Sequence, residues 1–150
     1  MLLFFDNVKI FSRLLNGHFP DYGNFFPRTY ATRSICRRSE LIQSLKQISL
    51  ISRENNYNTK VRFSPQEGIG LDTGDTEVGA GKVVVSADIE GKEDSIGVNS
   101  VYLLDVLNVI REDYVSISFE TNLSPVLVQP HSDTDKGESV YRHIIMPLKI

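Results

Sequence analysis

The chain has 150 residues, of which 41% are hydrophobic, and a formal net charge of −3. This length predicts one domain with a modest extra segment, and no window approaches the ~18 apolar residues of a membrane-spanning helix, so we expect no membrane partner. The single cysteine, Cys36, excludes an internal disulfide and favours a cytoplasmic protein.

The first third of the chain predicts strands, a linker and a helix. Residues 2–15 have the pattern of one or two short strands, and residues 16–28 form a linker with glycine and proline at its turns. Residues 29–38 alternate as a strand does. Residues 39–53 repeat leucine and isoleucine at helical spacing, with Ser39 as the expected N-cap.

The remaining two thirds predict a second helix and further strands. The helix is expected over residues 100–111, capped by Asn99 or Ser100. The expected strands lie at 60–65, 67–73, 77–89, 94–98, 113–120, 123–129 and 139–147, with a polar loop at 130–138. The order strand, helix, four strands, helix, three strands predicts an α+β fold with two helices on one face of antiparallel sheets.

Positive charge is concentrated at the beginning of the chain. Residues 1–60 hold nine lysines and arginines against four acidic residues, whereas residues 61–150 hold seven against fifteen. A protein that is acidic overall can still present one basic face, because screening at physiological salt limits charge interactions to about 8 Å. The net charge therefore does not exclude a nucleic-acid partner.

The chain is apolar up to its last residue. Residues 144–150 are Ile-Ile-Met-Pro-Leu-Lys-Ile, whereas most chain ends are polar and frayed unless something holds them. We expect this end to be a strand that docks at its start and lays Met146, Pro147 and Leu148 along a surface groove. We expect the segment 17–22, Gly-His-Phe-Pro-Asp-Tyr, to pair with it.

The residues give no support for an enzyme. His18, His131 and His143 fall in a linker, a loop and a strand, and none has cysteines or carboxylates at metal-ligand spacing. The stretch 79–82, Gly-Ala-Gly-Lys, lacks the first glycine of a phosphate-binding loop and has Val83 where that loop needs serine or threonine. We interpret it as a turn or bulge in a strand, and expect no catalytic residue, metal or cofactor.

Three motifs in a fixed order carry a family resemblance. The first is residues 12–22, in a stretch that ends at Pro27. The second is residues 96–108, and the third is the Met-Pro-Leu terminus at 146–148. Together they resemble the bacterial sliding clamp, the β subunit of DNA polymerase III. The resemblance covers the whole chain but little more than the last third of a family member, so we expect a fragment.

The resemblance implies a domain division and a fold. Residues 1–27 correspond to the end of the second clamp domain and its linker, and residues 28–150 to the third, C-terminal domain. The implied DNA-clamp fold has two helices lining the hole of a ring and sheets forming its outer wall.

The resemblance also implies two sites. Without the resemblance, the cationic side chains of the first helix are most simply interpreted as a solvated helix face. In a clamp, that face points toward the DNA backbone. The implied DNA-facing residues are Arg37, Arg38, Gln43, Lys46 and Arg53. The implied peptide groove is formed by Pro20, Asn24, Phe25, Asn99, Tyr102, Leu123, Pro125, Ile144, Met146, Pro147 and Leu148.

The implied function is replication processivity without catalysis. Expected partners are double-stranded DNA, bound without sequence preference, and the polymerase catalytic subunit, the clamp loader and repair proteins, each docking through a short peptide. Family members form a homodimeric ring, which we do not expect this fragment to close. One alternative is a stand-alone β-rich peptide-binding module unrelated to replication, and a small-molecule enzyme is a more distant one.

Overall fold

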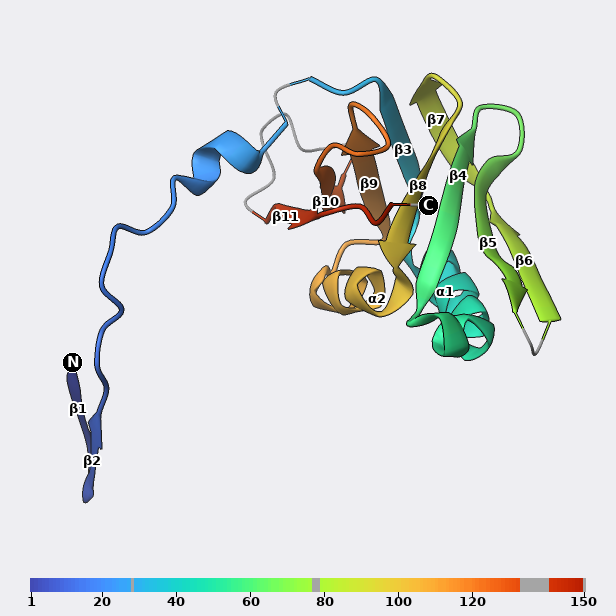
Figure 1. Ribbon diagram of the computed structural model, residues 1–150. Coiled ribbons are helices and arrows are strands. Elements are labelled where there is room, and N and C mark those ends of the chain that lie inside the picture. The colour runs from blue at the N-terminus through green and yellow to red at the C-terminus, as the bar shows by residue number, and fades with distance from the viewer. Residues whose placement is uncertain (28, 77–78, 133–140, 150) are drawn as a thin grey trace.

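The computed structural model in Figure 1 describes residues 1–27, 29–76, 79–132 and 141–149. Its strands are β1 (Leu2–Phe5), β2 (Val8–Phe11), β3 (Thr32–Arg37), β4 (Asn58–Ser64), β5 (Gly68–Thr76), β6 (Gly79–Val85), β7 (Ala87–Gly91), β8 (Asp94–Asn99), β9 (Tyr114–Phe119), β10 (Val126–His131) and β11 (His143–Ile145). Its α-helices are α1 (Arg38–Ser52) and α2 (Ser100–Val109), and two short 3-10 helices are η1 (Tyr22–Phe25) and η2 (Arg53–Asn55). Within these described stretches, no helix is both long and apolar enough to cross a membrane.

The described strands form three antiparallel sheets. The order is β11-β10-β9-β3-β7 in a five-stranded sheet and β6-β5-β4-β8 in a four-stranded sheet, while β1 and β2 form a separate hairpin. Figure 1 shows α1 and α2 side by side at one side of the two larger sheets. The predicted α+β class, with two helices packed on antiparallel sheets, is confirmed.

The prediction of one strand over residues 77–89 is wrong. β6 pairs with β5 in the four-stranded sheet, whereas β7 pairs with β3 in the five-stranded sheet. The chain changes sheet at Ser86, and the alternation of buried and exposed side chains continues through that change. Because the side-chain period stays at two, the pattern could not reveal the break. The helices are therefore separated by five strands, not four.

The hydrophobic core joins the two larger sheets. Phe63 on β4 and Phe119 on β9 are fully buried, and their ring centroids lie 5.0 Å apart at an angle of 58°. Each ring comes from a central strand of a different sheet, so this contact connects the two sheets. Tilted aromatic pairs at this separation stabilise beyond the area that they bury.

Helix α1 packs on the four-stranded sheet through the predicted apolar stripe. Leu41, Leu45 and Ile48 are buried, as their helical spacing predicts. On β6, a Cβ atom at Gly81 would lie 2.7 Å from Cδ1 of Ile51 in α1. The Gly-Ala-Gly-Lys stretch is part of β6, where a larger residue at Gly81 would displace isoleucine side chains of α1, and the pairing of β6 with β5 contains a register shift.

The beginning of α1 differs from the prediction. The helix begins at Arg38 with Arg37 as its N-cap residue, so the expected cap at Ser39 is wrong, and no side chain caps the helix. The backbone N–H of Arg38 instead donates to the carbonyl of Asp113 at 2.8 Å. A tertiary contact replaces the local capping residue that the sequence favoured.

Helix α2 begins at Ser100 as predicted, and of the two predicted caps Asn99 is the N-cap residue. Its Oδ1 accepts hydrogen bonds from the backbone N–H groups of Val101 at 2.9 Å and Tyr102 at 3.3 Å. Its Nδ2 donates to the carbonyl of Asn56 at 3.2 Å, which ties the cap to the turn before β4. The helix and its C-cap bury Leu103, Val106, Leu107 and Ile110. The Asn99 prediction is confirmed, and it satisfies two of the four unpaired N–H groups at a helix start.

The β1–β2 hairpin stands apart from the domain. In Figure 1 it lies at the far end of the linker that carries η1. Its large apolar side chains are exposed: Leu2, Leu3, Phe4, Phe5, Val8, Ile10 and Phe11. A two-stranded hairpin alone is marginally stable in water, and none of these side chains belongs to the core between the sheets.

Cys36 is expected to be unreactive in the folded protein. Burial first, and then the nearby carboxylate of Glu40, raise the pKa of its thiol from 9.0 to about 12. Only the thiolate attacks a disulfide reagent, so at pH 8 the folded thiol should react at least about a hundredfold more slowly than the unfolded one. The measurement is thiol titration with an aromatic disulfide, with and without guanidinium chloride. Equal rates would contradict the described burial.

The same raised pKa sets an alkaline limit on stability. Above about pH 9 the unfolded state loses the thiol proton while the folded state keeps it. The contribution of the protonated Cys36 thiol to the free energy of unfolding is therefore complete below pH 9, and it is lost as pH rises toward 12.

Candidate functional site

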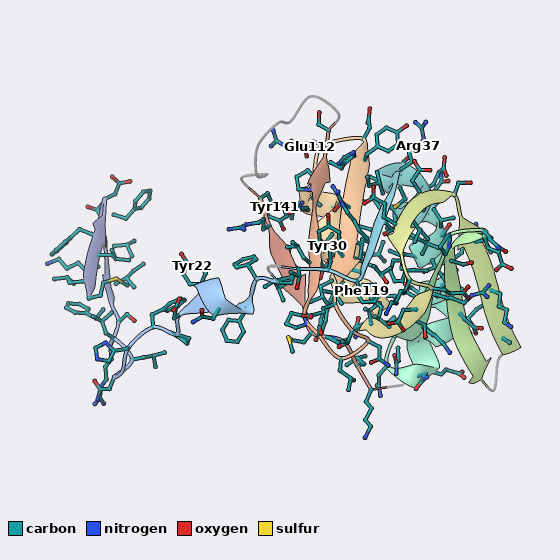
Figure 2. The ribbon with its side chains drawn as sticks, turned by 90° about the horizontal axis from the view of Figure 1, so that it is seen from above. Tyr22, Tyr30, Arg37, Glu112, Phe119 and Tyr141 are labelled. Atoms are coloured by element: carbon teal, nitrogen blue, oxygen red, sulfur yellow. The ribbon has the colours of Figure 1, made fainter. Side chains whose placement is uncertain are left out.

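A hollow of about 350 Å³ lies between the linker and the last strand. Tyr22 and Phe25 of η1, with Phe26, form its linker side, and β11 with its flanking residues forms the opposite side. Figure 2 shows Tyr22 on the linker, on the side of the domain that carries Tyr141. The residues that line the hollow are Tyr22, Phe25, Phe26, Arg142, His143, Ile144 and Met146.

The lining is apolar and adaptable on both sides. Met146 is 61% exposed, so its thioether is available to a ligand and not sealed in the core. A methionine can adjust its shape to varied apolar ligands, and aromatic rings give a large contact area at low entropic cost. The arrangement can accept a small number of apolar side chains from a partner.

A cation–π contact connects the linker with the residue before β11. The guanidinium of Arg142 lies over the ring of Phe26, 4.5 Å from its centroid. Next to it, the ring of His143 stacks on that of Tyr141, with centroids 6.4 Å apart. β11 itself pairs with β10, so the linker adds side chains to the hollow without joining the sheet.

The structure brings three of the predicted groove residues together: Phe25, Ile144 and Met146 line the hollow. Pro20 and Asn24 are on the linker but do not line it. The side-chain amide of Asn24 donates to Oδ2 of Asp21 at 2.9 Å, within the turn that begins η1.

The tail beyond the hollow runs toward the start of α2. The backbone N–H of Leu148, which follows Pro147, donates to the carbonyl of Gly97 at 2.7 Å, and Gly97 is two residues before Asn99 in β8. The side chain of Asn99 is used in capping, whereas Tyr102 is exposed.

The turn between β9 and β10 supplies the remaining predicted residues. Leu123 is exposed and Pro125 is half-buried. Pro125 precedes Val126, which pairs with Ile145 just before Met146. The turn thus lies beside the tail, although it does not line the hollow.

The sequence argument missed four residues of the hollow, Tyr22, Phe26, Arg142 and His143. The sequence contained an indication for two of them. Tyr22 and Phe26 are aromatic, lie on either side of Phe25, and are separated by about one helical turn. Arg142 and His143 gave no such indication, since polar side chains at a strand end are usually solvated.

The predicted DNA-facing residues divide into two groups. Gln43, Lys46 and Arg53 are exposed along α1 and its end. Within the described residues, neither Lys46 nor Arg53 has a salt bridge to a carboxylate. Leu50, which is 80% exposed, lies between them. This face presents exposed cations together with one apolar side chain.

Arg37 and Arg38 make contacts within the protein. Nε of Arg37 lies 3.3 Å from a carboxylate oxygen of Glu40, and its guanidinium stacks over the ring of Tyr114. Arg38 donates from Nε to the carbonyl of Glu112 at 2.9 Å and from Nη1 to that of Leu107 at 3.3 Å. Both guanidinium groups therefore have partners within the protein, although the pair of Arg37 with Glu40 is exposed.

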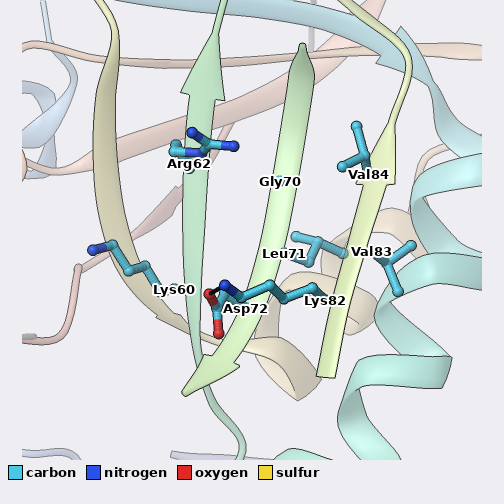
Figure 3. A pocket seen from close by; sticks show the side chains of 8 residues that line it. All are labelled: Lys60, Arg62, Gly70, Leu71, Asp72, Lys82, Val83 and Val84. Atoms are coloured by element: carbon cyan, nitrogen blue, oxygen red, sulfur yellow. Dashed lines mark ion pairs between the residues drawn. The ribbon is translucent and has the colours of Figure 1, made fainter. Parts of the chain in front are cut away.

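A second hollow, of about 320 Å³, lies on the four-stranded sheet. Figure 3 shows Lys60, Arg62 and Lys82 around it, with Asp72 directed toward Lys82. Lys82 pairs with Asp72 at 3.5 Å, and Arg62 pairs with Glu67 and, at 3.8 Å, with a carboxylate outside the hollow, Glu93. The lining itself holds three cations and one carboxylate, and the carboxylates of Glu67 and Glu93 lie beside it as partners of Arg62. In the described part of the chain, no cluster of histidine, cysteine and carboxylate side chains could hold a metal.

Comparison with known proteins agrees with this geometry. A family model described as "DNA polymerase III beta subunit, C-terminal domain" matches residues 24–149. The chain belongs to the DNA polymerase III beta subunit family. Its membership confirms the predicted resemblance.

Beta sliding clamps of known sequence cover nearly all of the chain. That of Staphylococcus aureus is 31% identical over 144 residues and that of Chlamydia muridarum is 30% identical, and the matches cover 95% and 96% of this chain. Both matches cover 37% of the relative. The chain thus spans less than two fifths of the length of these clamps.

Solved clamp structures share the fold. The beta subunit of Thermotoga maritima aligns with a TM-score of 0.83 at 26% identity, over 99% of this chain and 39% of that chain. The sliding clamp of Bacillus subtilis aligns with a TM-score of 0.81 at 30% identity, over 99% of this chain and 38% of that chain. The hairpin and linker are therefore included in these alignments.

Within this clamp domain, replacing Arg38 should cost stability. Arg38→Gln removes two charge-assisted hydrogen bonds to backbone carbonyls, and we expect the free energy of unfolding to fall by about 1–2 kcal/mol. Arg37→Gln is the control and should cost less than about 1 kcal/mol, because the Arg37–Glu40 pair is exposed. Urea denaturation followed by circular dichroism measures both. An equal loss in the two variants would contradict the structural role of Arg38.

Proposed function

We propose that this chain acts as the C-terminal domain of a DNA sliding clamp, a processivity factor that encircles duplex DNA and holds the replication machinery to it. The observation that carries the proposal is the apolar hollow between linker and final strand in a chain of the clamp family. In this proposal the polymerase catalytic subunit, the clamp loader and repair proteins dock there through short peptides. The domain itself performs no catalysis.

The DNA side of the proposal is supported by helix α1. Lys46 and Arg53 lie two turns apart on one exposed face, with Gln43 near them. Long cationic side chains attract phosphates without selecting a base sequence, and such contacts weaken as salt is added. A clamp that must slide needs contacts of this weak, non-specific kind.

The contribution of Lys46 can be measured through salt dependence. Each phosphate contact contributes about −0.9 to the slope of log K against log salt for duplex DNA. Lys46→Gln should therefore make that slope less steep by about 0.9, measured by fluorescence anisotropy with a duplex between 25 and 200 mM salt. Lys92→Gln, an exposed lysine in the turn between β7 and β8, should leave the slope unchanged. Equal slopes for both variants and the wild type would contradict the assigned face.

The peptide side of the proposal is supported by the lining of the hollow. Burying two or three ligand side chains contributes about 1.5–3 kcal/mol each, and ordering the peptide opposes part of this gain. The balance gives affinities in the micromolar range. A docking surface that serves several partners in turn needs such affinities, because tight binding would prevent exchange.

Titration with a short peptide tests the docking surface. A peptide that contains adjacent leucine and phenylalanine, added to the 150-residue chain, should bind saturably with one site. The control peptide replaces both residues with serine and should show no saturable binding. Absence of saturation with the apolar peptide up to millimolar concentration would contradict the proposal.

A further inference from the structure

The segment that follows β11 is attached to both larger sheets. Ile145, the last residue of β11, pairs with Val126 of β10 in the five-stranded sheet. Farther along, the backbone N–H of Leu148 donates to the carbonyl of Gly97 at 2.7 Å, in an isolated antiparallel bridge to β8, an edge strand of the four-stranded sheet. Figure 1 shows the chain running from β11 toward β8. Residues 146–148 therefore form a terminal strap that connects the two sheets.

The two attachments of the terminal strap differ in strength. Ile145 is buried in the core, and β11 pairs with β10 along its whole length. The attachment at Leu148 is a single bridge, because Pro147 before it has no N–H with which to pair. In the part of the chain that the structure describes, this is the one backbone hydrogen bond between the strap and β8, and we call it the clasp. It can open without disturbing the core, since Leu148 is 38% exposed.

Met146 lies between these two attachments and lines the hollow on its strand side. Because the chain is held before it at Ile145 and after it at Leu148, the backbone of Met146 has few accessible conformations. Ordering a residue during binding opposes association, and a residue that is already ordered avoids this cost. The clasp therefore prepares one wall of the hollow before a ligand arrives.

We propose that the clasp holds Met146 in its docking position, which makes Leu148 a positioning residue for peptide binding although it does not line the hollow. The proposal rests on the proposed function of the hollow as a docking site and adds the contact that sets its shape. When the clasp opens, the strap is attached only at Ile145, and the strand side of the hollow loses its fixed position.

Replacing one backbone amide with an ester tests the clasp without changing any side chain. The α-hydroxy analogue of leucine, incorporated at position 148, removes the N–H donor and keeps the leucine side chain. It should weaken binding of a leucine–phenylalanine peptide by about five- to tenfold, since the peptide must then order the strap itself. The matched control is the α-hydroxy analogue of lysine at position 149, where the N–H donates to no backbone carbonyl of the described residues. Its affinity should equal that of the wild type.

Hydrogen exchange in the wild-type chain gives an independent readout. If the clasp favours peptide binding, thermodynamic linkage requires that bound peptide favours the clasp by the same factor. At saturating peptide, the amide hydrogen of Leu148 should therefore exchange about five- to tenfold more slowly, measured by nuclear magnetic resonance. The amide of Lys149 is the control and should keep its rate. A clasp with a merely structural role would leave the Leu148 rate unchanged as well.

The possible outcomes separate the two proposals. Equal affinities of the two ester variants, or a Leu148 exchange rate that saturating peptide does not change, would overturn the role of the clasp and leave the docking function in place. If the ester at position 148 prevents folding, the exchange measurement on the wild type decides alone. Failure of the wild-type chain to bind the peptide would contradict the docking function itself, and with it this inference.

Discussion

Replacing Phe63 with alanine is expected to lower the free energy of unfolding by about 3–5 kcal/mol. Phe63 is fully buried on β4, and its ring meets that of Phe119 on β9 at a centroid distance of 5.0 Å. The substitution removes apolar contacts and leaves a cavity between the two sheets, which closely packed neighbours can fill only in part. A loss of this size is a large fraction of the stability of a small domain.

Urea denaturation followed by far-ultraviolet circular dichroism measures this loss. Phe19→Ala is the matched control, because Phe19 is 84% exposed on the linker and its loss should cost less than about 0.5 kcal/mol. If Phe63→Ala fails to fold, Phe63→Leu should show a smaller loss of the same sign. A loss for Phe63→Ala similar to that for Phe19→Ala would contradict the described packing between the sheets.

The double variant Phe25→Ala, Met146→Ala is expected to weaken binding of a leucine–phenylalanine peptide by about tenfold, or roughly 1.4 kcal/mol. Phe25 lies on the linker side of the hollow and Met146 on the strand side. Removing both side chains takes apolar contact area from the two opposite sides of the hollow. A bound peptide side chain then stays partly exposed to water. Because both residues are exposed in the free protein, the fold should remain intact.

A peptide titration monitored by fluorescence anisotropy measures this effect. Leu50→Ala provides the control, since it removes an exposed apolar side chain from α1, which does not line the hollow. Its affinity should equal that of the wild type. If Leu50→Ala weakened binding as much as the double variant, the peptide would bind at a surface other than the hollow.

The helices could be predicted from sequence because their signals are local. The apolar spacing of Leu41, Leu45 and Ile48 fixes which face of α1 is buried, and Asn99 is a strong N-cap by its own chemistry. The start of α1 could not be placed, because a carbonyl distant in sequence, that of Asp113, replaces a local cap. Pairing partners could not be predicted either, so the change of sheet at Ser86 was missed.

The strand side of the hollow could be predicted better than its charged edge. An apolar chain end that includes Met146 is unusual enough to indicate a contact surface, and the family resemblance placed Phe25 near it. Arg142 and His143 have no such signal, because only the fold brings them beside Phe26. The contacts of Arg37 and Arg38 could not be predicted either. The sequence does not show that Arg37 pairs with Glu40 or that Arg38 donates to two backbone carbonyls.

The most direct test uses the two methionines of the chain, Met1 and Met146. Protein labelled with carbon-13 at the methionine methyl groups should give one signal from each, and the leucine–phenylalanine peptide is added in steps. If the final strand and the linker form the docking surface, the Met146 methyl signal shifts saturably while the Met1 signal, from the distant end of the hairpin, stays in place. A peptide that binds without moving the Met146 signal, or that moves only Met1, would contradict this account.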